Sequence, residues 1–116
     1  MHWLIVVPAA ACVLLGPALA VAGPATSLPD PVYGKSLAQT LCSNCHLVGP
    51  GQKQANVDIP SFREIANEQA QTEGSIMASI VLPKHPMPAI PLTKAELADL
   101  AAYIMTLRDP EMRSIP

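Results

Sequence analysis

The chain has 116 residues, half of them hydrophobic, and its seven basic and nine acidic residues give a formal net charge of −2. It has neither an excess of basic residues nor a run of like charges, so we expect no nucleic-acid partner. The length allows a single small domain.

An uncharged, apolar stretch from Trp3 to Ala22 opens the chain. Small residues alternate near its end in the pattern that precedes signal-peptidase cleavage, so residues 1–22 are interpreted as a signal peptide for export to the periplasm. Neither Lys nor Arg precedes the apolar run, and the run is long enough to span a bilayer. An uncleaved membrane anchor through residues 3–22 is therefore the alternative.

Three segments are expected after this leader. Residues 23–29 contain Pro, Ser and Thr without periodicity, which predicts a flexible tether. Residues 30–110 are expected to form the folded domain, and residues 111–116 its C-terminal tail. The domain has few aromatic residues for its length, so a staple or a bound group is expected to complete its core.

The first predicted helix begins at Asp30-Pro31. An Asp side chain can accept hydrogen bonds from the free N–H groups of a helix, and Pro presets φ at the first helical position. Tyr33, Leu37 and Leu41 follow at four-residue steps, which predicts a helix that runs to the Cys42 region.

The next segment, Cys42-Ser43-Asn44-Cys45-His46, has the C-x-x-C-H pattern of covalent haem attachment. Two thiols can bond the haem vinyl groups while the adjoining imidazole ligates the iron. Structural zinc would need a second Cys or His pair, which is absent from the sequence. A thioredoxin-like redox pair would need βαβ patterning, and a Cys42–Cys45 disulfide would leave His46 unexplained. One covalently attached haem is therefore the predicted cofactor.

Further helices are predicted from local signals. Residues 48–59 are rich in Gly, Gln, Asn and Pro and predict a loop. Ser61 and Glu64 fit a capping box, so a short helix should follow Pro60. Another helix is predicted from Ser75 to Leu82, where Pro83 stops it.

The clearest helix follows the capping-box pair of Thr93 and Glu96 and ends at Asp109-Pro110. Its apolar residues occupy helical spacings along one stripe, with two more on the adjoining face. The stripe contains Leu97, Leu100, Ala101, Ile104 and Met105, and the adjoining face has Tyr103 and Leu107.

Four prolines between Pro83 and Pro91 exclude a helix there and place Met87 on a stiff loop. A thioether is a weak iron ligand, so a rigid backbone would help to hold its sulfur in place. His85 is the alternative ligand, since an imidazole binds iron more strongly. Met77 and Met105 fall within helical patterns and are interpreted as core residues. We favour Met87 as the sixth ligand.

Taken together, these segments resemble the class I c-type cytochromes, the small monohaem cytochromes of bacterial periplasms. The resemblance covers about Pro31 to Leu107 and includes the helix before the attachment motif, a Pro-containing segment, the Met-bearing loop and a C-terminal helix. It implies an all-α, small cytochrome c fold with three to five helices around one haem. Val48-Gly49-Pro50-Gly51 replaces the longer glycine pattern of many relatives, so no residue role is carried over between Leu47 and Asp58.

The resemblance also implies roles for single residues. Cys42 and Cys45 would hold the haem by thioether bonds, and His46 and Met87 would be the metal ligands. Pro60 resembles the proline whose carbonyl accepts a hydrogen bond from the proximal imidazole, and Gly34 and Tyr103 resemble residues where the terminal helices cross. 

The expected function is single-electron transfer between periplasmic redox proteins by a monomer that is not an enzyme. The alternatives are a haem subunit of a larger dehydrogenase or oxidase complex, and a haem enzyme or gas sensor with a displaceable sixth ligand. The donor and acceptor proteins are not identified by any charge cluster or aromatic patch.

Overall fold

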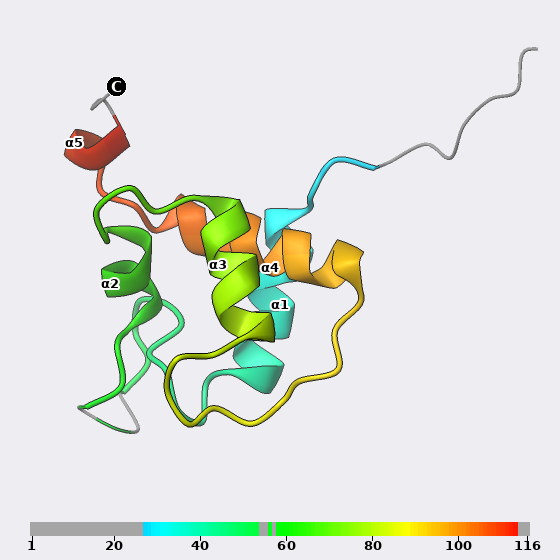
Figure 1. The fold of residues 1–116 in the computed structure, drawn as a ribbon. Coiled ribbons are helices and arrows are strands. Elements are labelled where there is room, and N and C mark those ends of the chain that lie inside the picture. The colour runs from blue at the N-terminus through cyan, green and yellow to red at the C-terminus, as the bar shows by residue number, and fades with distance from the viewer. Residues whose placement is uncertain (1–26, 54–55, 57, 114–116) are drawn as a thin grey trace, which may run out of the picture.

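A computed structural model describes residues 27–53, 56 and 58–113 of the chain. The described residues form five α-helices and no strand (Figure 1), which confirms the predicted all-α fold with three to five helices. The signal peptide or anchor predicted for residues 1–22 lies outside the described residues, as does most of the tether. Within the described ranges, no helix combines the length and the apolar character needed to cross a membrane.

Helix α1 spans Pro31–Leu41 and starts where the sequence predicted. The Asp30 carboxylate accepts hydrogen bonds from the backbone N–H groups of Val32 at 2.9 Å and Tyr33 at 3.2 Å. The predicted apolar stripe is not the face that α1 buries, because Tyr33 and Leu41 are 46% and 40% exposed. The buried positions are instead Gly34 and Ala38. Small residues are buried here because α1 packs closely against helix α4, Lys94–Thr106.

Helices α2 and α3 both begin at capping boxes. Helix α2 spans Phe62–Ala66 and has the predicted pair, with the Ser61 hydroxyl accepting from the Glu64 N–H and the Glu64 carboxylate accepting from the Ser61 N–H. Helix α3 spans Glu73–Val81 and starts two residues before the predicted Ser75. Thr72 is its cap, and Ser75 takes the place that Glu or Gln usually holds in this motif.

Helix α4 spans Lys94–Thr106 and carries the predicted Thr93–Glu96 capping box. Leu100, Ala101 and Ile104 of its apolar stripe are buried, as expected. Tyr103, predicted on the adjoining face, is also buried, because its hydroxyl donates a hydrogen bond of 2.6 Å to the backbone carbonyl of Val48. A short helix that was not predicted, α5, spans Pro110–Arg113.

The core lies where α1, α2 and α3 pack against α4. α1 makes the most extensive contact with α4, and α2 and α3 contact other parts of α4. Figure 1 shows the segment between α3 and α4 as a wide yellow loop on the side where α1 ends. The buried apolar residues are Ala38, Cys42, Val48, Phe62, Ala66, Ile76, Leu100, Ala101, Tyr103 and Ile104.

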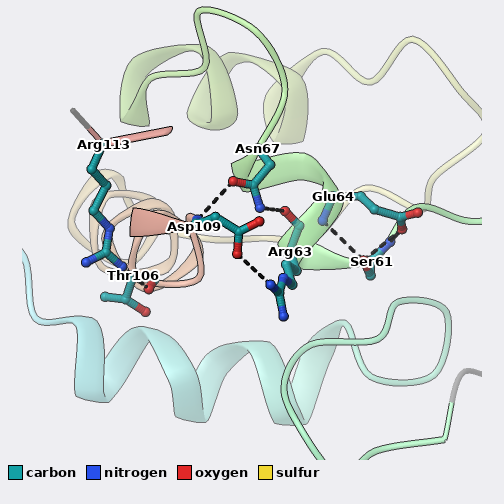
Figure 2. A network of polar contacts seen from close by, with 7 residues as sticks. All are labelled: Ser61, Arg63, Glu64, Asn67, Thr106, Asp109 and Arg113. Carbon is teal, nitrogen blue, oxygen red and sulfur yellow. Dashed lines mark hydrogen bonds and ion pairs between the residues drawn. The ribbon is translucent and has the colours of Figure 1, made fainter. Parts of the chain in front are cut away.

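A polar network joins α2 to the segment that follows α4 (Figure 2). The Arg63 guanidinium donates to the Asp109 carboxylate at 2.6 Å, and Asn67 accepts from the Asp109 backbone N–H at 2.9 Å. The Asn67 amide also donates to the Arg63 carbonyl at 2.8 Å. These bonds fix α2 against the C-terminal end of α4, so the residues just before α2 have a defined position.

Candidate haem site

The C-x-x-C-H segment forms a tight turn at the end of α1. The Cys42 N–H donates to the Ala38 carbonyl at 2.9 Å, which continues the helical hydrogen bonding by one residue. The N–H groups of Cys45 and His46 then both donate to the Cys42 carbonyl, at 3.1 Å and 2.9 Å. The turn therefore gathers both thiols and the imidazole at one end of α1.

This turn borders a cavity of about 590 Å³. Its volume lies within the range of roughly 300–1,000 Å³ that is usual for sites that hold small molecules and cofactors. Apolar side chains from α3 and α4, including Ile76, Leu100 and Ile104, form part of its wall. The five residues predicted from the sequence all line it, namely Cys42, Cys45, His46, Pro60 and Met87.

The His46 ring is held from two sides. Its Nδ1 atom lies 2.7 Å from the Pro60 carbonyl oxygen, and the Phe62 ring lies 5.4 Å away between centroids at an angle of 47°. A carbonyl oxygen can only accept, so Nδ1 must be the nitrogen that carries the proton. In the neutral ring Nε2 is then unprotonated and free to ligate a metal ion.

The two cysteines are not joined by a disulfide and lie in different environments. Cys42 is buried and Cys45 is exposed at the mouth of the cavity. Burial, with a smaller electrostatic contribution from Cys45, raises the pKa of the Cys42 thiol to about 11. Cys42 is therefore uncharged near neutral pH and is compatible with the apolar wall around it.

The Pro-rich loop brings two of the predicted ligand candidates to the cavity. Met87 is half-buried and His85 is exposed, and both contribute to the lining. Met77 and Met105 are partly buried and pack against the core cluster, as their helical spacing predicted. The apolar wall, two thiols, one oriented imidazole and one thioether together fit a covalently held haem.

Gln52 is the residue near this site that the sequence did not reveal. Its side chain forms hydrogen bonds with the backbone of Ser43 and His46 in the attachment segment and of Val48 just after it. The sequence around it predicted only a loop, because a single polar side chain in a Gly-rich segment has no periodic signal.

Comparisons with known proteins point to one family. Residues 31–108 match the sequence model of the cytochrome c family. Cytochrome c-552 of Bradyrhizobium diazoefficiens is 40% identical over 93 residues, which cover 78% of this chain and 88% of that protein. No solved structure gives a significant match.

Proposed function

Because the chain belongs to the cytochrome c family and so carries covalently attached haem c, we propose that it transfers single electrons between periplasmic proteins through an iron ligated by His46 and Met87. The observation that carries the proposal is the position of Cys42, Cys45, His46 and Met87 around one cavity. The family relationship itself supports the broader role of a haem electron carrier.

Each residue of the cavity has a part in this proposal. Bound haem supplies an iron that cycles between the ferric and ferrous states. Cys42 and Cys45 hold the porphyrin edge through two thioether bonds, so the cofactor stays attached in both states. The Pro60 carbonyl orients the imidazole of His46 and, by accepting a hydrogen bond from its Nδ1–H, raises the basicity of Nε2.

Met87, which also lines the cavity, would complete the ligand set. Pro86 and Pro88 flank it directly and restrict the backbone, which lowers the entropy lost when the sulfur is held in place. With His46 and Met87 both bound to the iron, no ligand position would be left for a substrate. This ligand set favours electron transfer over an enzymatic reaction at the iron.

The proposed partners are redox proteins of the periplasm that dock transiently. Cys45 is exposed at the mouth of the cavity, so the porphyrin edge bonded to it would lie nearest to solvent and to a partner. We propose export through residues 1–22 and action as a monomer.

The test is to produce the full chain with a haem-maturation system and to record visible spectra of the oxidised and reduced protein. Haem that remains attached after acid-acetone extraction supports the two thioether bonds. A weak far-red sulfur-to-iron band and an absence of carbon monoxide binding support His/Met ligation. Attached haem that binds carbon monoxide readily would instead favour a sensor or enzyme, and no attached haem beside a working control would overturn the proposal.

A further inference from the structure

The side chain of Gln52 forms three hydrogen bonds with the backbone in and just after the attachment segment. Nε2 donates to the Ser43 carbonyl at 2.8 Å and to the His46 carbonyl at 3.0 Å. Oε1 accepts from the Val48 N–H at 3.2 Å. One half-buried carboxamide therefore joins three backbone groups, those of Ser43, His46 and Val48.

The three partners determine which way the amide is oriented. Two carbonyl oxygens require two N–H donors, and one backbone N–H requires an acceptor, which is what a carboxamide offers. Rotating the amide by half a turn would place its oxygen against both carbonyls. A carboxylate at this position would keep the bond from Val48 but lose both donors, and an apolar side chain would lose all three bonds.

These bonds complete a frame around His46. Its carbonyl is held by Gln52, its ring Nδ1 is held by Pro60, and the carbonyl of the next residue, Leu47, accepts from the Phe62 N–H at 2.9 Å. Pro60 and Phe62 lie at the far end of the loop that follows His46, whereas Gln52 lies within that loop. Gln52 is the side chain that joins Ser43, between the two cysteines, to the histidine and to Val48.

We propose that Gln52 is a positioning residue, whose carboxamide clamps the segment from Cys42 to Val48 and thereby fixes the orientation of the His46 imidazole at the iron. The proposal rests on the proposed function in one respect, since it takes His46 as the proximal ligand. It adds a specific requirement for two N–H donors at position 52. A side chain that merely fills space in the loop has no such requirement.

The test compares Gln52→Glu and Gln52→Met in the full chain with haem attached. Gln52→Glu keeps the length and the acceptor but removes both donors, and Gln52→Met keeps the length and removes all three bonds without adding charge. Gln69→Glu, at an exposed position after α2, is the matched control for charge. The readouts are the proton NMR shifts of the haem methyl groups in the oxidised protein, which depend on the plane of the axial imidazole, and the reduction potential.

Both Gln52 variants are expected to change the pattern of haem methyl shifts and to move the potential, whereas Gln69→Glu leaves both as in the wild type. If the Gln52 variants lose only unfolding free energy and keep the wild-type methyl pattern and potential, Gln52 is a structural brace and the proposal is overturned.

If neither Gln52 variant retains haem, a measurement on the wild-type protein tests the proposal. The two Nε2 protons of Gln52 should be separately resolved and protected from solvent exchange, because each is donated to a carbonyl. Rapid exchange of both protons would overturn the clamp. Failure of the wild type to attach haem is a different result, which would overturn the proposed function itself.

Discussion

Gly34 of α1 lies against the backbone of Asp99 in α4, so closely that a β-carbon at position 34 would be 2.0 Å from the Asp99 carbonyl oxygen. The atom in the way belongs to a helix backbone and cannot rotate aside. The start of α1 is tied to the same residue, since the Asp30 N–H donates to the Asp99 carboxylate at 2.7 Å. The crossing of α1 and α4 therefore depends on the absence of a side chain at position 34.

Replacing Gly34 with Ala is expected to force the two helices apart. Overpacking of this kind costs about 1–3 kcal/mol, which outweighs the gain of up to about 1 kcal/mol in helix propensity. Urea unfolding of the haem-loaded protein measures the loss. The matched control is Gly74→Ala in α3, where the nearest atom to a new β-carbon is the Thr72 hydroxyl oxygen at 3.9 Å. Gly74→Ala should leave the unfolding free energy unchanged or raise it. An equal loss in both variants would contradict a special requirement for glycine at position 34.

The Tyr103 hydroxyl is the second long-range tie of α4, since it donates to the carbonyl of buried Val48 just beyond the attachment motif. Tyr103→Phe keeps the ring but leaves that carbonyl without the donor, and we expect a loss of about 1–3 kcal/mol of unfolding free energy. Tyr33→Phe, on a half-exposed ring whose hydroxyl makes only a minor contact with the carboxylate of Glu96, should cost less than about 0.5 kcal/mol. Equal costs for the two variants in urea unfolding would rule out a special contribution from the Val48 bond.

The two capping boxes that contain a glutamate make the stability of the fold depend on pH at acidic pH. Hydrogen bonds from the backbone N–H and then the hydroxyl of Ser61 hold the pKa of Glu64 below its ordinary value of 4.5. The N–H and hydroxyl of Thr93, with a smaller contribution from Tyr33, lower the pKa of Glu96 in the same way. A carboxyl group whose pKa is lower in the folded than in the unfolded state stabilises the fold at any pH above its unfolded-state pKa. This stabilisation is lost as the pH falls through the folded-state pKa.

The double variant Glu64→Gln and Glu96→Gln should therefore lose less stability than the wild type when the pH is lowered from neutral to well below 4.5. Glutamine can still accept hydrogen bonds from the cap but does not titrate. Urea midpoints measured by far-UV circular dichroism across this range provide the comparison. Parallel pH profiles for the two proteins would show that these carboxylates contribute nothing to acid unfolding.

Features that depend on residues close in the sequence were predictable. Helix starts could be inferred directly, because each cap depends on residues at most four positions apart, as at Asp30, Ser61 and Thr93. The cofactor could be inferred in the same way, because the C-x-x-C-H motif is equally short. The start of α3 was missed by two residues because Ser75 replaces the acidic residue by which a capping box is usually recognised.

Features decided by distant contacts were not predictable from one sequence. The spacing of the large apolar residues of α1 did not indicate its buried face, which follows from the approach of Gly34 to Asp99, far apart along the chain. Only the family resemblance had placed Gly34 where the terminal helices cross. The contact of Tyr103 with Val48 and the three bonds of Gln52 are likewise invisible in local patterns. The proline-rich loop is an intermediate case. Its composition predicted a stiff segment, and its course past α1 places Met87 and His85 on the same cavity.

Because Met87 and His85 both line the cavity, the sixth ligand of the iron can be tested by replacing each residue in turn. Met87→Ala removes the thioether and should open the iron, so that the ferrous protein binds carbon monoxide. Its reduction potential should fall, since methionine ligation is known to raise the potential of cytochromes c. His85→Ala should keep the far-red band and the potential of the wild type, and Met77→Ala, in the core, should lower only the unfolding free energy. An unchanged spectrum and potential in Met87→Ala would remove Met87 as the ligand, and the same changes in His85→Ala instead would assign the position to that imidazole.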